Sequence, residues 1–285
     1  MCSMSLTRRS FLALSAALPF ASRLNASKTK PSSIPIGLEL YSVRDVLKTD
    51  LQGTVRAVAQ MGYQCVEFYA PYYDWTEAQA KDMRKLLDDL GVHCYSTHNG
   101  EDYFKADKIE HARNLNLILG THYMVMASSN PKPGLDGWKG VADELNTAAD
   151  NLKSAGLKVG YHNHQPEFTK VDGVYPLEIL AKNTHPSIML QLDVGTCVST
   201  GADPVAWIRS HPGRIRSLHL KDWSHDSSKG FQTLFGEGDA PWKQIFAAAE
   251  SVGGVEYYLL EQEGSRYGEL ETAKRCLQGY HEMRA

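Results

Sequence analysis

The chain has 285 residues, of which 42% are hydrophobic and 22% are charged, as in a soluble globular protein with a sizeable core. Its length suits one barrel of ordinary size or two smaller domains. The formal net charge of −3 argues against nucleic acid or an anionic membrane surface as a partner, because such a balance attracts no polyanion.

The first residues have the composition of an export signal. Arg8 and Arg9 precede a mostly apolar run over residues 11–21, which is too short to span a bilayer as a stop-transfer helix. This arrangement resembles a twin-arginine signal, and an ordinary secretory signal is the alternative. We expect residues 1–26 to be a signal peptide and residues 27–35 a linker. The mature protein would then be periplasmic or otherwise exported, with no membrane attachment after signal removal.

After Pro35, short β-branched or aromatic runs alternate with longer amphipathic stretches. The spacing of the runs is close to the 30 or so residues that a strand, a crossover helix and two loops require. Eight strands are predicted to begin near Ile36, Gln64, Val92, Thr121, Leu157, Ser187, Arg214 and Glu256.

Helix signals fill the stretches between these strands. Residues 76–90 open at Thr76, with Gln79 as a capping-box partner, and Gly91 ends them. Residues 141–155 end at Gly156 in the same way. Asp203 followed by proline opens another helix.

Eight alternating strand–helix units predict an α/β protein with a parallel sheet and helices outside. Eight units in about 250 residues favour a closed barrel over an open sheet. We therefore predict a single (β/α)8 TIM barrel over residues 36–285, with no second domain.

The five cysteines do not form a Cys-x-x-Cys pair, and the first lies in the expected signal peptide. We expect the others to be buried thiols, and a disulfide between Cys65 and Cys94 is the alternative in an oxidising compartment. The cysteines are Cys2, Cys65, Cys94, Cys197 and Cys276.

The active site of such a barrel forms where the strands end, and each of the last four predicted strands ends in residues that can bind a metal or move a proton. These are His162 and His164, with Glu167 shortly after, on strand five; Asp193 on strand six; His219 and Lys221 on strand seven; and Glu261 on strand eight. Glu39, Glu67 and His98 follow earlier strands and are candidate substrate-binding residues.

Each of these residues alone is more often a solvated or salt-bridged surface group than a functional one, and Lys221 could simply pair with Asp222. Their recurrence on four successive strands favours a site. Asp193, His219 and Glu261 would meet above the barrel, where carboxylates and an imidazole suit Mn²⁺, Mg²⁺ or Co²⁺, with Zn²⁺ also compatible.

Several motifs together resemble a known family. They are Gly37 to Asp45 (GLELYSVRD), Val66-Glu67, Asp193-Val194-Gly195, His219-x-Lys221-Asp222, Gly236-Glu237-Gly238 before Trp242, and Glu261-Gln262. Their order is similar to that of the xylose isomerase-like barrels that include sugar phosphate isomerases and epimerases. The resemblance covers nearly the whole predicted mature chain.

The resemblance implies one divalent metal, most simply Mn²⁺, held by Asp193, His219, Glu261 and a glutamate on strand five. His162 stands where that glutamate is expected. Either His162 takes the ligand position, which we favour, or Glu167 reaches in from the loop.

The resemblance also implies a reaction in which a base removes a proton next to a carbonyl while the metal stabilises the negative charge. Glu261 would be one base, and its partner would be His162, His164, Glu167 or Lys221. We predict a metal-dependent isomerase or epimerase acting on a sugar or keto-sugar.

Two other functions remain open. One is a lyase, dehydratase or hydratase acting on 3-keto-glycosides or inosose-like keto-sugars, a chemistry that a histidine or lysine partner would suit. The other is a non-catalytic exported carbohydrate-binding protein. A small carbohydrate is the expected partner in every case, and a homo-oligomer is compatible with the sequence.

Overall fold

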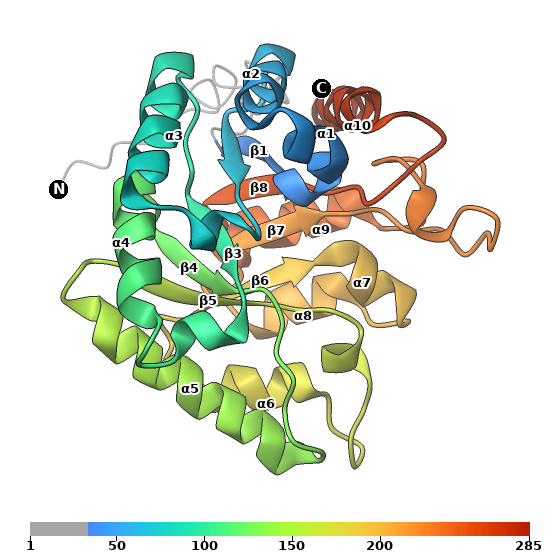
Figure 1. Ribbon diagram of the computed structural model, residues 1–285. Helices are drawn as coiled ribbons and strands as arrows, with labels where there is room; N and C mark the ends of the chain where they lie inside the picture. The colour runs from blue at the N-terminus through green and yellow to red at the C-terminus, as the bar shows by residue number, and fades with distance from the viewer. Residues whose placement is uncertain (1–33) are drawn as a thin grey trace, which may run out of the picture. The chain divides into compact units, whose positions relative to one another are not determined.

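The computed structural model describes residues 34–285, so the predicted signal peptide and all but the last two residues of the predicted linker lie outside the described residues. The strands surround a common centre (Figure 1), and there are eight of them. They are β1 (Ile36–Glu39), β2 (Cys65–Glu67), β3 (Ser96–Asn99), β4 (Tyr123–Met126), β5 (Lys158–His162), β6 (Met189–Asp193), β7 (Ser217–Leu220) and β8 (Tyr257–Leu260).

The strands form one parallel sheet in the order β2-β1-β8-β7-β6-β5-β4-β3. Two isolated parallel bridges join the end strands, Cys65 with His93 and Phe68 with Thr97. The predicted (β/α)8 barrel is therefore confirmed, with its sparsest pairing between β2 and β3. That sparse seam explains why β3 begins at Ser96 rather than near Val92 as predicted.

Helices follow the strands and lie outside the barrel (Figure 1). They are α1 (Arg44–Thr49), α2 (Leu51–Met61), α3 (Glu77–Leu90), α4 (Ile109–Leu119), α5 (Leu135–Lys153), α6 (Pro176–Asn183), α7 (Val194–Ser199), α8 (Pro204–Ser210), α9 (Trp242–Ala248) and α10 (Glu269–Arg284). Short helical turns occur at η1 (Leu40–Val43), η2 (Tyr72–Asp74), η3 (Glu101–Phe104), η4 (Pro166–Phe168), η5 (Gly230–Gln232) and η6 (Ala249–Gly253).

Two of the three helix predictions are confirmed at their ends. Thr76 and Gln79 form the capping box of α3, which ends at Gly91 with φ of 67°. The Asp203 carboxylate accepts two backbone N–H groups at the start of α8.

The third helix, α5, begins at residue 135 instead of 141, and it ends at Lys153 instead of at Gly156. Its first turn contains Gly137, where a Cβ atom would lie 1.8 Å from the Lys132 carbonyl oxygen. Only glycine allows that close approach, and its low helix propensity hides the helix start from the sequence.

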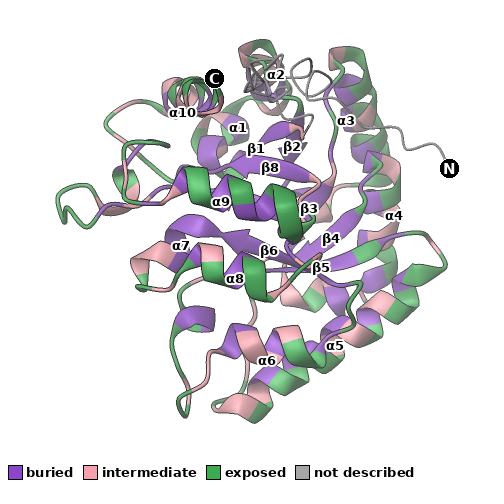
Figure 2. Cartoon of the chain, turned by 180° about the vertical axis from the view of Figure 1, so that it is seen from behind, coloured by how far each residue is buried: buried purple, intermediate pink, exposed green. Residues whose placement is uncertain are grey.

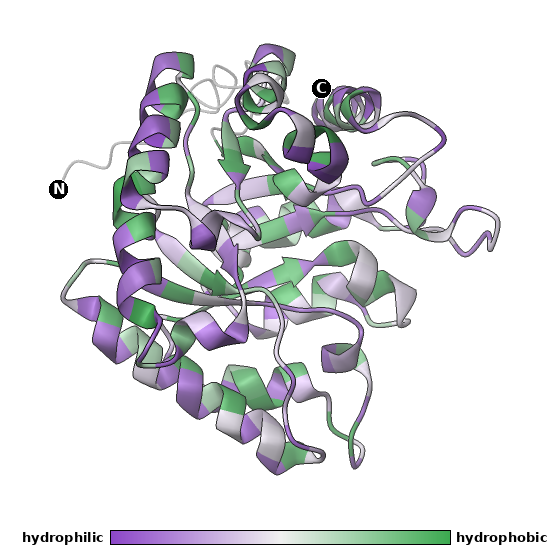
Figure 3. Ribbon diagram, viewed as in Figure 1, coloured by the Kyte–Doolittle hydropathy of each residue, from purple (hydrophilic) through white to green (hydrophobic). Residues whose placement is uncertain are grey.

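The hydrophobic core has two parts. The larger lies between the strands and the outer helices, which carry both hydrophobic and hydrophilic residues (Figure 3). The smaller lies inside the barrel and contains Cys65, Tyr123, Val125, Met189, Tyr257 and Leu259. The strands are buried almost throughout (Figure 2), as expected for a parallel sheet covered by helices.

The four cysteines of the described residues, Cys65, Cys94, Cys197 and Cys276, are buried and free. The prediction of buried thiols is confirmed, and the alternative Cys65–Cys94 disulfide is absent from this part of the chain. None of the helices in residues 34–285 combines the length and apolar character that a bilayer crossing requires.

Candidate functional site

Alternation along the strands points every second side chain into the barrel. In β8 these side chains are Tyr257 and Leu259, followed just past the strand by Glu261, and β6 ends in the same way at Asp193. In these two strands the inward side chains are thus apolar near the start and polar at the carboxyl end. The predicted site residues belong to this polar end.

A cavity of about 500 Å³ lies at the polar end. Six of the predicted site residues line it: Glu39, His98, His162, His164, Lys221 and Glu261. Four others lie behind the lining and are buried: Glu67, Glu167, Asp193 and His219.

His219 lies between two carboxylates. Its Nδ1 is 2.7 Å from an oxygen of Glu261, and its Nε2 is 2.8 Å from an oxygen of Glu67. Burial alone would lower the pKa of His219, but these hydrogen bonds raise it well above its usual value. Burial alone would raise the pKa of Glu67, but His98 and His219 lower it to about 2. The buried side chain of His219 therefore bridges two carboxylates.

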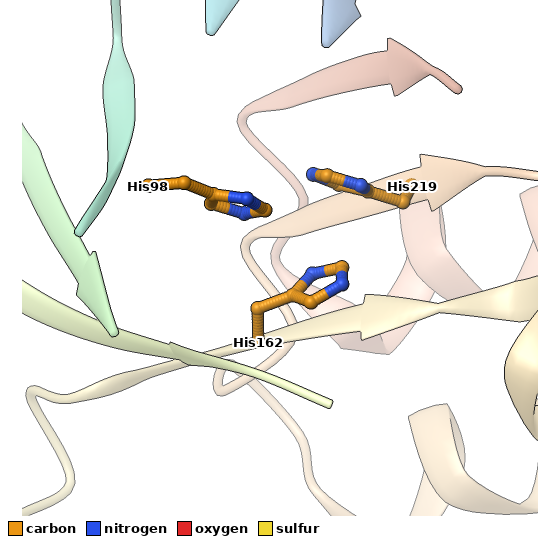
Figure 4. A group of neighbouring side chains, drawn as sticks. All are labelled: His98, His162 and His219. Atoms are coloured by element: carbon orange, nitrogen blue, oxygen red, sulfur yellow. The ribbon is translucent and has the colours of Figure 1, made fainter. Parts of the chain in front are cut away.

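Three histidines from different strands meet beside this bridge (Figure 4). The rings of His98 and His219 are stacked at 5.1 Å, and the His162 ring lies 4.4 Å from that of His219. The side-chain oxygen of Gln191 lies 2.8 Å from Nε2 of His98 and 3.1 Å from Nδ1 of His162. Burial, followed by the neighbouring histidines, lowers the pKa of His162 well below its usual value, so that this ring is neutral.

Asp193 has one oxygen that no hydrogen bond satisfies. Its Oδ1 accepts the backbone N–H of Thr196, whereas the buried Oδ2 has no hydrogen-bond partner within the described residues. His162, Asp193 and Glu261 each offer one potential metal-ligand atom, and these three atoms lie within 4.8 Å of one another. His98, His162 and His219 form a second such group.

These donors fit a divalent metal ion. A bound cation would satisfy the buried carboxylate oxygen that has no hydrogen bond and that faces an imidazole. Glu67 accepts at Nε2 of His219 and thereby leaves Nδ1 directed at Glu261. The structure brings the four predicted ligands together, with His219 joined to the group through Glu261.

Lys221 extends from the end of β7 into the same cluster. Its Nζ lies 3.7 Å from Asp193 Oδ2, 3.5 Å from Glu261 Oε1, and in contact with Glu263. Burial would lower its pKa, but these carboxylates raise it, so Lys221 keeps its proton. By contrast, burial would raise the pKa of Glu261, but Lys221 and His219 lower it, and this carboxylate is ionised.

The alternative pairing of Lys221 with Asp222 does not occur. Asp222 turns the other way and accepts the backbone N–H groups of Gly236 and Gly238 and the indole N–H of Trp242. The glycine–tryptophan motif after β7 is therefore the loop that surrounds Asp222.

Glu167 does not reach the metal-ligand group. Its carboxylate accepts the hydroxyl hydrogen of Tyr161, at 2.5 Å, and the backbone N–H of His164, at 2.8 Å. It therefore holds the segment that carries His164, and the structure brings His162, not Glu167, to Asp193.

Glu67 likewise has no access to a substrate. It is fully buried among His98, His219, Ser96 and Gln191, behind the cavity wall. Glu67 was predicted to bind substrate, but in the structure it orients the ring of His219 instead of lining the cavity. Glu39 and His98, which were predicted with it, do line the cavity.

Gln191 is the buried residue that the sequence analysis missed. It donates to Glu67 at 3.0 Å and accepts from His98 and His162, so it links β2, β3 and β5 to its own strand, β6. It lies two residues before Asp193 and therefore points to the same side of β6. A polar residue at an inward position inside an otherwise apolar strand was the available signal.

Comparisons with known proteins agree with the observed fold. A sugar phosphate isomerase/epimerase from Parabacteroides distasonis has 27% identity and a TM-score of 0.76, covering 91% of this chain and 96% of that one. An inosose dehydratase from Clostridium tetani is 30% identical over 154 residues, which is 48% of this chain and 51% of the relative. The chain thus spans about half the length of the curated relatives it matches.

The structure of the IOLI protein, with a bound zinc atom, has a TM-score of 0.70 at 12% identity, which shows the shared fold alone. The relatives bear enzyme names, in agreement with the predicted enzyme. The sequence pattern of one family matches residues 55–279, most of the described chain. The chain belongs to the xylose isomerase-like TIM barrel family.

Proposed function

We propose that this protein is a metal-dependent isomerase or epimerase that removes a proton next to the carbonyl of a sugar or keto-sugar. The observation that carries the proposal is the convergence of His162, Asp193, His219 and Glu261 beside a cavity that also receives Lys221. A cavity of about 500 Å³ is in the range of small-molecule sites.

His162, Asp193, His219 and Glu261 would hold one divalent ion. We propose Mn²⁺, because two carboxylates and two imidazoles suit it, and Mg²⁺, Co²⁺ and Zn²⁺ are the competitors. When bound, the metal would supply Lewis-acid stabilisation of negative charge on a substrate oxygen.

The chain's own residues supply the proton transfers. Glu261 is ionised, lines the cavity and can accept a proton from a substrate carbon. Lys221 keeps its proton and lines the same wall, so it can donate a hydrogen bond or a proton to a substrate oxygen. His164, held by Glu167 through its backbone, is the third group that a substrate can contact.

The second candidate is dehydration of an inosose-like keto-sugar. Two observations favour it: a histidine stands at the strand-five ligand position, and several relatives are named inosose dehydratase. In this reaction Glu261 takes the proton, and Lys221 protonates the hydroxyl group that leaves from the neighbouring carbon.

A single experiment separates these functions. The manganese-loaded protein is incubated with ketoses and with an inosose in deuterated water, and the products are examined by NMR and mass spectrometry. Isomerisation or epimerisation gives an isomer that carries deuterium in place of a carbon-bound hydrogen and has lost no water, whereas dehydration gives a product that has lost one water. No turnover of any of these compounds, together with their measurable binding, would favour the carbohydrate-binding alternative.

Export remains a separate proposal, based on Arg8 and Arg9. We propose that the mature protein acts in the periplasm. Fractionation of cells that produce the full chain should find the protein in the periplasm. When both arginines are replaced by lysine, the protein should remain in the cytoplasm. An unchanged distribution would contradict the twin-arginine route.

A further inference from the structure

Two polar atoms at the ends of β1 and β2 are buried without a hydrogen bond from any of residues 34–285. They are Oε1 of Glu39 and the hydroxyl oxygen of Tyr69. Glu39 is 1% exposed, and both residues line the cavity. Buried polar groups in native proteins are almost always satisfied, so an unpaired acceptor and an unpaired hydroxyl on one cavity wall point to a ligand.

Neighbouring residues hold this pair in place. The other oxygen of Glu39 accepts the backbone N–H of Tyr41 at 2.8 Å, which leaves Oε1 unpaired. The Tyr41 ring meets the Tyr69 ring edge-on at 5.1 Å, and the Arg44 guanidinium lies over Tyr41 at 4.6 Å. The two groups are therefore fixed before any ligand binds, as a preorganised site requires.

We propose that Glu39 and Tyr69 form a subsite that binds adjacent hydroxyl groups of an uncharged polyol ring. This inference rests on the proposed carbohydrate activity of the same cavity and adds where the unreactive part of the substrate is recognised. In the strand order, β1 is four strands away from β5. A ring anchored at Glu39 and Tyr69 would thus extend across the barrel mouth toward His162.

The chemistry of the pair selects hydroxyl groups. The tyrosine hydroxyl can donate and the carboxyl oxygen can accept, and a vicinal diol offers one acceptor and one donor. The carboxyl group of Glu39 can accept a hydrogen bond from a hydroxyl in either protonation state, so the subsite does not depend on the charge of Glu39. The exposed ring of Tyr41, which also lines the cavity, offers an apolar face for the C–H groups of a sugar.

The lining disfavours a phosphorylated sugar. Lys221 is the sole lysine or arginine among the described lining residues, and three carboxylates already surround it. Glu39, Glu261 and Glu263 line the same cavity. Apart from the proposed metal ion, a phosphate group would therefore meet acidic side chains without an unpaired lysine or arginine.

Calorimetric titration of the manganese-loaded protein with myo-inositol, D-glucose and myo-inositol monophosphate tests the subsite. We expect at least one uncharged polyol to bind at least tenfold more tightly than the monophosphate. Tyr69→Phe should lower the affinity for that polyol about tenfold, because it removes one buried hydrogen bond. Glu39→Gln should act similarly, because its amide N–H₂ would replace the acceptor. Tyr175→Phe, at a partly buried tyrosine outside the cavity wall, is the matched control and should bind as the unsubstituted protein does.

Tyr69→Phe decides the outcome if Glu39→Gln fails to fold, which thermal unfolding reveals. Unchanged polyol affinity in Tyr69→Phe, absence of binding by both polyols, or tighter binding of the monophosphate would overturn the subsite. Turnover of a keto-sugar with an unchanged KM in both variants would also overturn it and leave the proposed function standing. Polyol binding that depends on both residues, without turnover of any keto-sugar, would support the subsite and reject the proposed function.

Discussion

The interior of the barrel has two layers built on the same strands with opposite chemistry. Near the start of the strands it holds Cys65, Tyr123, Val125, Met189, Tyr257 and Leu259, an apolar cluster. Two residues further along the same strands it holds charged and imidazole groups, as Leu259 gives way to Glu261 and Cys65 to Glu67. The lower layer excludes water and stabilises the fold, whereas the upper layer buries charges that must neutralise one another.

This contrast shows how one fold separates stability from chemistry. Gly37 marks the apolar layer, because a Cβ atom there would lie 2.4 Å from the sulfur of Cys65. In the upper layer, the buried carboxylates of Glu67, Asp193 and Glu261 each have an imidazole or ammonium partner, through His219 or Lys221. Substitutions in the two layers should therefore have separable effects.

The largest effect is expected for Glu261→Gln in the upper layer. Loss of the base should lower kcat by about 10²–10⁴-fold. Steady-state turnover of the substrate found in the deuterium experiment measures this. Glu256→Gln is the matched control, because Glu256 precedes the same strand at its other end and pairs with Arg216 and Tyr123. Equal kcat in the two variants would contradict the role of Glu261.

The next effect is expected for Leu259→Ala in the lower layer. Removing a fully buried leucine should lower the free energy of unfolding by about 2–5 kcal/mol, because it leaves a cavity. Chemical denaturation measures the loss, and kcat at a temperature where the variant is folded should remain within about twofold. A large fall in kcat of the folded variant would show that the layers are not separable.

A smaller effect is expected for Glu67→Gln. This substitution tests the upper layer at the residue that lies closest to the lower layer on β2. Glu67 touches no ligand, but it fixes the ring of His219, so its loss should weaken Mn²⁺ affinity about 10–100-fold. Metal titration measures this, again with Glu256→Gln as the control. An unchanged Mn²⁺ affinity in Glu67→Gln would contradict the proposal that Glu67 positions His219.

The smallest effect concerns the thiols. Burial raises the pKa of Cys65, Cys94 and Cys276, so these groups are protonated at pH 8. The folded protein should react with a thiol reagent at pH 8 far more slowly than the denatured protein does. Rapid labelling of Cys65, identified by mass spectrometry, would show that the apolar layer admits water.

Much of the fold follows from the sequence because its signals are local. Thr76 and Gly91 identify α3 through capping alone, and the strand spacing identifies eight units. The start of α5 was wrong because the need for Gly137 arises from a contact with Lys132 that no local pattern records.

The candidate site was predictable only in part. Strand ends correctly predicted the residues that gather at the barrel mouth, including His162 and Lys221. They could not predict which inward residues line the cavity and which lie behind it, because this depends on depth along the barrel axis. Glu67 and Glu167 illustrate this, and Gln191 was missed because it precedes the strand end.

The proposed function requires that the upper layer of the barrel holds one divalent cation. Calorimetric titration of the chelator-treated protein with Mn²⁺ tests this most directly. We expect one ion per chain and a loss of at least tenfold in affinity in Asp193→Asn, which alters the carboxylate whose Oδ2 accepts no hydrogen bond from residues 34–285. Absence of Mn²⁺, Mg²⁺, Co²⁺ and Zn²⁺ binding, or equal affinity in Asp193→Asn, would contradict it.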